Sequence, residues 1–289
     1  MTTNKNTLEH IIHGIFLLMG LVAVGCVLLI TVYLVISGIP AILEIGLIDF
    51  LFGKEWASTA TDPKYGIWAF ILTSIYGTAG AIVIGVPIGF MTAVYLSKIA
   101  SPKVKSMMQS AVSLLAGIPS VVYGLVGMLE LVPGIRKIFG VPDGASLLAA
   151  IIVLAIMILP SIIKMSITAL DAVPKEYEDA SLALGATPIE TYFKVSVPAA
   201  KSGIAAAVVL GVGRAIGEAM AVMMVAGNVP NMPDSIFQSV RFLTTAVSSE
   251  MAYSSGLQQQ ALFSIALVLF LFIMLINATL NFFLKRETE

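Results

Sequence analysis

Long runs of apolar residues without a charged side chain are the feature that most constrains this sequence. Five such windows occur, and they cover residues 14–43, 66–97, 106–129, 144–163 and 251–284. A membrane-spanning helix needs about 20 mostly apolar residues, because the hydrocarbon core of a bilayer is roughly 30 Å thick. Each window meets that length. The sequence therefore predicts an all-α membrane protein.

A sixth apolar stretch, residues 202–226, carries Arg214 and Glu218 near its middle. With it, the sequence predicts about six transmembrane helices in one domain covering residues 1–289. The expected spans are roughly 14–37, 67–96, 107–129, 145–166, 202–226 and 258–284. In the second span, small residues recur every four positions, which predicts a helix face that another helix can approach closely. They are Gly77, Ala81, Gly85, Gly89 and Ala93.

The composition excludes several functions. Hydrophobic residues make up 58% of the chain and charged residues 11%, whereas soluble domains carry about 25% charged residues. Sixteen Lys+Arg balance seventeen Asp+Glu, so no basic surface indicates binding to nucleic acid. One cysteine and two histidines supply no disulfide and no metal cluster. No phosphate-binding loop and no catalytic constellation occur, so we expect a non-enzyme that neither hydrolyses ATP nor binds a cofactor itself.

The distribution of positive charge predicts the orientation. Loops on the cytoplasmic side of a membrane carry the excess of Lys and Arg. In a six-span arrangement, one side holds ten of them, against five on the other side and Arg214 within a span. The richer side includes both termini. We therefore expect a multi-pass protein of the bacterial or archaeal plasma membrane with both termini in the cytoplasm.

The loop between the fourth and fifth spans, residues 171–201, is the most patterned polar stretch. Acidic residues after Pro174 favour a helix start, and Gly185 suits the left-handed residue that ends a helix. Thr187 can cap a second helix, with Glu190 three residues later. The sequence predicts a helix, a glycine turn and a second helix on the cytoplasmic side.

This loop resembles the EAA loop of the binding-protein-dependent permeases of ABC importers. The matching residues are Asp179-Ala180-Ser181, then Gly185, then Val195-Ser196-Val197-Pro198. The resemblance implies a coupling helix that sits in a groove of a cytoplasmic ATPase. The alternative is an ordinary amphipathic hairpin. The candidate coupling residues are Glu178, Asp179, Ala180, Ser181, Gly185 and Pro198.

The charged pair in the fifth span is the candidate substrate site. Arg214 and Glu218 are four residues apart, so on one helix their side chains would lie on one face and reach each other. An Arg near the bilayer centre costs about 2.5–3.5 kcal/mol and is expected to face the bundle interior or water. The pair would either order the bundle or line an anion path, with Arg214 offering its donors and Glu218 orienting the guanidinium and competing with the anion.

Three stretches resemble the phosphate permeases of ABC importers, the PstC type more than the PstA type. They are residues 213–222 around the charged pair, residues 116–124, and Trp56 with residues 65–67. The resemblance implies a MetI-like architecture and phosphate as cargo. Pro119-Ser120 could begin a half-helix whose amides meet an anion, so Ser120 is a third candidate; the alternative is helix packing with a kink.

The same resemblance implies partners and a mechanism. They are a second permease of the PstA type, two copies of an ATPase of the PstB type that would bind ATP and Mg, an extracytoplasmic phosphate-binding protein of the PstS type, and the lipid bilayer. Transport would proceed by alternating access. Three alternatives stay open: a permease for sulfate or molybdate, a self-contained ion-coupled transporter or channel, and a membrane scaffold.

Overall fold

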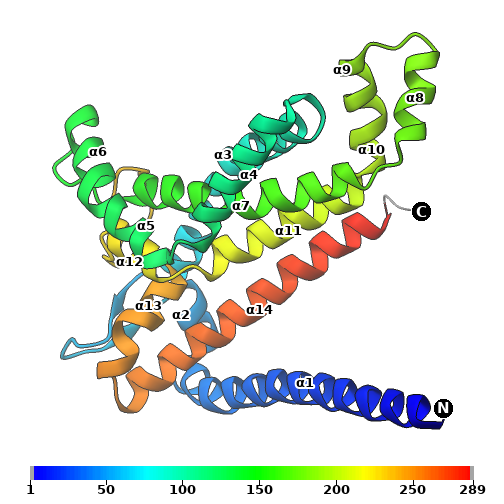
Figure 1. The fold of residues 1–289 in the computed structure, drawn as a ribbon. Helices are drawn as coiled ribbons and strands as arrows, with labels where there is room; N and C mark the ends of the chain where they lie inside the picture. The colour runs from blue at the N-terminus through cyan, green and yellow to red at the C-terminus, as the bar shows by residue number, and fades with distance from the viewer. Residues whose placement is uncertain (1–2, 287–289) are drawn as a thin grey trace.

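The computed structural model describes residues 3–286, and this part of the chain is almost entirely helical (Figure 1). The long helices are α1 (Thr3–Ile45), α3 (Trp68–Val94), α4 (Pro102–Gly117), α7 (Leu147–Asp171), α11 (Lys201–Gly217) and α14 (Gly256–Arg286). The shorter ones are α2 (Leu47–Phe52), α5 (Ser120–Val126), α6 (Val132–Phe139), α8 (Lys175–Ala183), α9 (Pro188–Thr191), α10 (Val197–Ala199), α12 (Met220–Val225) and α13 (Leu243–Glu250).

A few irregular elements complete the fold. Three turns are π-helical, namely η1 (Tyr95–Ile99), η2 (Gly127–Leu131) and η3 (Tyr192–Ser196), and one is a 3₁₀ turn, η4 (Met251–Tyr253). A short antiparallel hairpin joins β1 (Trp56–Ala57) to β2 (Lys64–Tyr65), with Trp56 opposite Tyr65.

Four described helices are long and apolar enough to cross a membrane. They comprise residues 12–45 of α1, 68–99 of α3 with η1, 147–171 of α7, and 256–279 of α14. Two further pairs qualify when taken together: α4 with the run from α5 to α6, bent by 95°, and α9–α10 with α11, bent by 71°. Counting each pair as one span gives six, and the predicted fold class is confirmed.

The third predicted span, 107–129, is wrong as a single helix. Helix α4 ends at Gly117, and α5 begins at Ser120 in a new direction. Ile118 between them is extended, as a residue before proline prefers to be, and Pro119 cannot donate the backbone hydrogen bond that would continue the helix. The hydroxyl of Tyr123 donates to the carbonyl of Leu115 across the bend at 2.7 Å.

The fifth predicted span, 202–226, is also interrupted. Helix α11 ends at Gly217, Glu218 is extended, and α12 begins at Met220. Glu218 stabilises the break with two hydrogen bonds. Its carboxylate accepts from the amide of Ala221 at 3.0 Å, and its backbone carbonyl accepts from the Thr244 hydroxyl at 2.8 Å. A run of apolar residues can therefore hold two helices.

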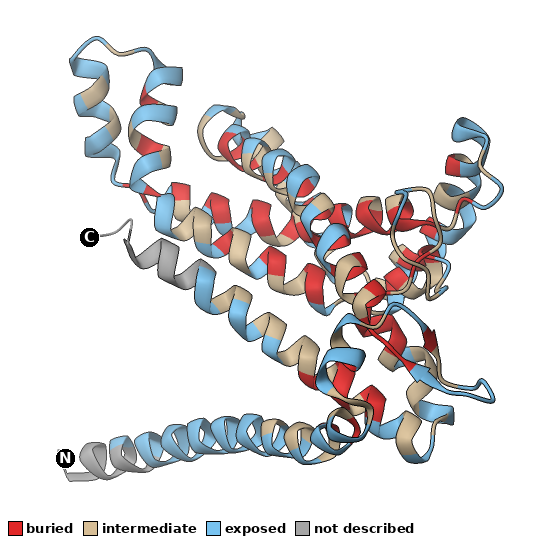
Figure 2. Ribbon diagram, turned by 180° about the vertical axis from the view of Figure 1, so that it is seen from behind, coloured by how far each residue is buried: buried red, intermediate tan, exposed pale blue. Residues whose placement is uncertain are grey.

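The core forms where α3 packs on α7, the most buried helix of the bundle (Figure 2). The small residues of α3 are buried, as predicted from their spacing. A Cβ on Gly85 would lie 2.7 Å from Ile158 Cδ1, and one on Gly89 would lie 2.9 Å from Ile162 Cγ2. Since any larger side chain would push on Ile158 or Ile162, glycine sets how closely the two helices approach.

Helix α1 stands apart from this core. Its C-terminal part meets α14, where Ser264 donates to the Gly38 carbonyl at 2.5 Å and Tyr33 contacts Phe263 edge-on. Toward the N-terminus α1 diverges from α14, and its apolar residues from 12 to 30 are exposed (Figure 1, Figure 2). An apolar helix uncovered by its own chain must be covered by lipid or by another protein.

Helices α8, α9, η3 and α10 form a two-legged projection at one end of the bundle, here called the 175–199 hairpin (Figure 1). The β1–β2 hairpin, α2 and α13 lie at the opposite end, here called the far end. At the far end, Trp56 is buried against Tyr65 and Phe70. The two ends are linked by α3, α7 and α11.

Candidate functional site

Arg214 lies in the last turn of α11, where a cation interacts favourably with the helix dipole. It is half-buried and faces a groove of about 690 Å³ between α7, α11 and α14. Its Nη1 donates to the Ser161 hydroxyl at 3.4 Å. The groove is lined by Ser161, Met165, Ala206, Val209, Leu210, Gly213, Arg214 and Asn277.

The chemistry of this groove favours an anion. A guanidinium carries five N–H donors, and within the described chain Arg214 commits one of them, to Ser161. Asn277 adds an amide, and the lining contains no carboxylate in the described chain. An oxyanion entering the groove would therefore meet donors and one positive charge.

The predicted pairing of Arg214 with Glu218 is wrong. Because α11 ends at Gly217, the two residues no longer share a helix face, and no ion pair joins them in the described structure. Glu218 instead accepts from the amide of Ala221 in the first turn of α12, in the manner of a helix cap. The expected competition between Glu218 and an anion for Arg214 loses its basis.

Two groove residues, Ser161 and Asn277, were missed by sequence reasoning. Ser161 follows Pro160 inside an apolar span, and Asn277 interrupts the last apolar window. An isolated polar residue in a span is a signal that could have found them, because polar groups in a membrane must find a partner or water. Which spans bring them together could not be read from the chain.

Ser120 is not part of the groove. It is the first residue of α5, as predicted, and it is partly buried after the bend at Pro119. The structure does not bring Ser120 together with Arg214 in one cavity. An anion at the start of α5 stays a prediction.

The 175–199 hairpin contains the predicted elements. Gly185 has φ of +87°, the left-handed conformation that glycine adopts without strain, and a Cβ there would meet open space. Thr187 and Glu190 form a capping box: the Glu190 amide donates to the Thr187 hydroxyl, and the Thr187 amide donates to the Glu190 carboxylate. Pro174 is the N-cap residue of α8, directly before its first residue, Lys175.

The tip of this hairpin exposes large apolar side chains. Leu184 is 90% exposed and Ile189 is 63% exposed, and Leu182 is exposed beside them. Leu184 directly precedes Gly185 in the turn. Exposed apolar groups on a projecting element are typical of a surface that a partner protein covers.

The candidate coupling residues divide into two groups. Glu178 and Ser181 bond within the chain: Glu178 to Lys98 and Ser196, and Ser181 to Thr191 at 2.9 Å. Four others are exposed, namely Asp179, Ala180, Gly185 and Pro198.

Glu178 has an altered acidity. Burial raises the pKa of its carboxyl, but the hydrogen bonds from Lys98 and Ser196 and the charge of Lys98 outweigh burial, so the pKa lies below its ordinary value. The group is therefore a carboxylate at neutral pH.

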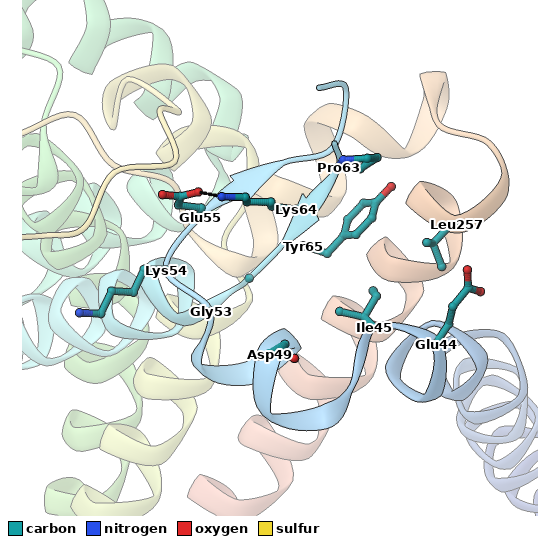
Figure 3. A pocket seen from close by; sticks show the side chains of 11 residues that line it. Glu44, Ile45, Asp49, Gly53, Lys54, Glu55, Pro63, Lys64, Tyr65 and Leu257 are labelled. Atoms are coloured by element: carbon teal, nitrogen blue, oxygen red, sulfur yellow. Dashed lines mark hydrogen bonds and ion pairs between the residues drawn. The ribbon is translucent and has the colours of Figure 1, made fainter. Parts of the chain in front are cut away.

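A second cavity, of about 620 Å³, lies at the far end between α1, α2, the β1–β2 hairpin and α14 (Figure 3). Figure 3 shows Glu44, Asp49 and Glu55 among the side chains that line it. Lys64 is paired with Glu55 at 2.6 Å. Because carboxylates outnumber free cations on this lining, the cavity does not suit a phosphate or another oxyanion.

The fold is a bundle of four to six candidate membrane-spanning helices with an exposed hairpin between its fourth and fifth spans. Residues 85–287 match the family described as the inner membrane component of binding-protein-dependent transport systems. The chain belongs to this family, which confirms the family predicted from the EAA-type loop. It is a transport subunit of an ABC importer rather than an enzyme.

Two relatives are similar to this chain over most of its length. The chain is 41% identical over 266 residues to a protein of Bacillus subtilis named probable ABC transporter permease protein YqgH, covering 89% of this chain and 86% of that protein. It is 33% identical over 242 residues to the phosphate transport system permease protein PstC of Pasteurella multocida, covering 77% and 75%.

Solved structures agree on the fold. A chain of the MetNI methionine ABC transporter in an inward-facing conformation is similar with a TM-score of 0.58 and 22% identity. The similarity covers 78% of this chain and 95% of that chain.

Proposed function

We propose that this chain is the permease of an ATP-driven importer of inorganic phosphate. The observation that carries the proposal is Arg214 in the groove between α7, α11 and α14: among the residues that the structure describes, it has donors to spare and the groove lining holds no carboxylate. Several relatives over most of the chain are named phosphate transport permeases, which supports phosphate among the oxyanions.

The groove would hold phosphate weakly. The guanidinium of Arg214 would bind two phosphate oxygens through parallel N–H groups, which is the geometry that arginine favours. Ser161 and Asn277 carry both donors and acceptors, so they can also accept from a protonated phosphate oxygen. The groove is open and partly apolar. An ion held by one charge and two neutral groups leaves readily, as a conduit requires.

The 175–199 hairpin would connect the permease to its energy source. We infer that the hairpin seats in a cytoplasmic ATPase of the PstB type, with Leu184, Ile189 and Gly185 at the contact. ATP and Mg would bind to the ATPase and not to this chain. ATP-driven movement of the hairpin would open the groove alternately to the two sides of the membrane. Ser120 at the start of α5 would lie along the route.

The remaining partners follow from the same proposal. The exposed apolar length of α1 suits a second permease of the PstA type or lipid. A phosphate-binding protein of the PstS type would dock at the far end. The hairpin and both termini would then lie in the cytoplasm, as the Lys and Arg bias predicts.

The test is phosphate uptake by the complex reconstituted with its partner subunits in proteoliposomes. Arg214→Gln removes the charge but keeps a side chain of similar length, and Arg136→Gln on the exposed face of α6 is the matched control. Losing hydrogen bonds from a charged group costs about 1.5–3 kcal/mol, so uptake should fall roughly 10- to 150-fold. ATP hydrolysis should persist, and the control should transport normally.

Three outcomes would contradict the proposal. Normal uptake by the Arg214→Gln complex would remove the groove from the route. If sulfate or molybdate were taken up in preference to phosphate, the cargo would be that anion and not phosphate. Phosphate flux through this chain alone without ATP would make it a self-contained transporter.

A further inference from the structure

Glu178 of the 175–199 hairpin forms an ion pair with Lys98 at the end of the second span. The distance from Lys98 Nζ to Glu178 Oε1 is 2.6 Å, and the Ser196 hydroxyl donates to the same oxygen at 2.8 Å. Glu178 belongs to α8, Lys98 to η1 and Ser196 to η3. Lys98 lies 80 residues before Glu178, so a distant element and two elements of the hairpin meet at one oxygen atom, here called the Glu178 junction.

The Glu178 junction is shielded from water. The side chains of Lys98 and Glu178 are 10% and 18% exposed, and Ser196 is fully buried. The i,i+4 pair between Lys194 and Glu190, on the outside of the same hairpin, is 75% and 46% exposed. Exposed ion pairs contribute little to stability, because water can replace either partner. A shielded pair keeps its geometry, because leaving one of its charges unpaired and buried is costly.

The backbone at the Glu178 junction departs from α-helical geometry on two sides. Lys98 and Ser196 both lie on π-helical turns, where the amide of Ala100 donates to Tyr95 and the amide of Val197 donates to Tyr192. A π-helical turn inserts one residue and re-aims the side chains around it, and such turns are frequent at functional sites. Here both turns direct a donor to the same carboxylate.

The Glu178 junction connects the hairpin to a helix, α3, to which it is not joined directly along the backbone. The hairpin joins α7 through Ala172 and α11 through Ala200. Lys98 ties it in addition to α3, which reaches the far end about 48 Å away at a rise of about 1.5 Å per residue.

At the far end, α3 approaches the break in the fifth span. The Ser74 hydroxyl of α3 accepts from the amide of Leu243 at 3.1 Å. The adjacent Thr244 donates to the carbonyl of Glu218, where α11 ends one turn after Arg214. A movement of α3 would therefore be felt at the break beside the groove.

We propose that Lys98 is a positioning residue for energy coupling: through Glu178 it makes α3 follow the 175–199 hairpin when the ATPase moves that hairpin. The proposal rests on the proposed coupling of the hairpin to an ATPase. Without Lys98, the hairpin would move while α3 stays behind, and ATP would be hydrolysed with little import.

The first experiment measures whether the hairpin and α3 move together. Spin labels are placed by Glu176→Cys and Tyr76→Cys, two exposed positions on α8 and α3, in a Cys26→Ser background. Distances are recorded in the reconstituted complex with and without a non-hydrolysable ATP analogue. We expect one unchanged distance when Lys98 is present, and a nucleotide-dependent shift or broadening in the Lys98→Met protein.

The second experiment measures phosphate imported per ATP hydrolysed. In the Lys98→Met complex this ratio should fall roughly tenfold, within the range of allosteric couplings, while hydrolysis and the amount of bound ATPase stay near normal. Lys98→Arg should restore the ratio. The matched control is Lys105→Met, which breaks the pair with Asp171 between α4 and α7 without involving the hairpin.

The outcomes separate the two proposals. An unchanged ratio in Lys98→Met, or the same label distances with and without Lys98, would overturn the role of Lys98. Loss of the ATPase from the Lys98→Met complex without rescue by Lys98→Arg would also overturn it, since the pair would then only fold the hairpin. Active hydrolysis without phosphate import by the unmodified complex would overturn the proposed cargo, and the label distances would still decide the role of Lys98.

Discussion

Replacing Glu250 should destabilise the far end of the protein more than replacing a member of an exposed ion pair would. Its carboxylate accepts from Arg241 at 2.5 Å, from the Trp56 indole at 3.2 Å, and from Ser58 and Gln258 at 3.1 Å. These donors come from the β1–β2 hairpin and its turn, from the segment before α13 and from α14. Glu250 thus joins three segments.

The magnitude follows from burial. The side chains of Arg241 and Glu250 are 13% and 20% exposed, and removing one partner of a buried pair costs about 3–5 kcal/mol. Arg241 keeps two bonds to the carbonyl of Asn228 and lies 5.8 Å from the ring of Phe70. We therefore expect the lower end, about 3 kcal/mol, for Glu250→Ala. At about 2–4 °C per kcal/mol this lowers Tm by roughly 6–12 °C.

The assay is thermal unfolding of the purified protein in detergent, followed by tryptophan fluorescence, since Trp56 itself contacts Glu250. Glu55→Ala is the control, because it removes an acid whose pair with Lys64 is largely exposed and therefore contributes little to stability. Equal shifts in Tm for the two variants would refute the reasoning from burial.

Three further outcomes are expected. Because the pKa of Glu178 is lowered, this carboxylate stabilises the folded protein fully above its ordinary pKa of about 4.5, and the stabilisation is lost as the pH falls through the lowered pKa. In Lys98→Met, carboxyl ¹³C NMR should show the pKa of Glu178 rising toward its ordinary value. Gly185→Ala should cost about 1–2 kcal/mol from its positive φ, whereas Gly134→Ala in α6 should be neutral or stabilising in the same unfolding assay. Gly85→Ala should cost about 1–3 kcal/mol by pushing on Ile158, and a Tm equal to that of the parent would contradict close α3–α7 packing.

The sequence predicts the parts of this fold that depend on neighbouring residues. Hydropathy locates the apolar helices because each span is a continuous local run. The 175–199 hairpin is predictable for the same reason: Gly185, Thr187 and Glu190 act within a few residues of one another. Their roles as cap and turn need no knowledge of the rest of the chain.

The start of a helix at Ser120 was one of two alternatives that the sequence left open, whereas the break after Gly217 was not predicted, because averaged hydropathy does not see the backbone. Pro119 and Gly217 were visible, yet what stabilises the second break is the bond from Thr244, 26 residues beyond Glu218. The expected Arg214 pair with Glu218 failed for this reason: it assumed a continuous helix.

The contents of the groove and of the Glu178 junction depend on packing between distant segments. Ser161 lies 53 residues before Arg214, and Lys98 lies 80 residues before Glu178. Nothing local in the chain specifies such partners. They follow from the close packing of α3 on α7 and of α7 on α11.

We propose that Arg214 faces a water-filled passage through which phosphate moves. The direct measurement is the labelling rate of Ser161→Cys, in a Cys26→Ser background, by a water-soluble thiol reagent in the reconstituted complex. We expect a labelling rate that differs between the ATP-bound and nucleotide-free states and that phosphate lowers. A cysteine at this position that stays unreactive in both states, or whose labelling phosphate does not affect, would contradict it.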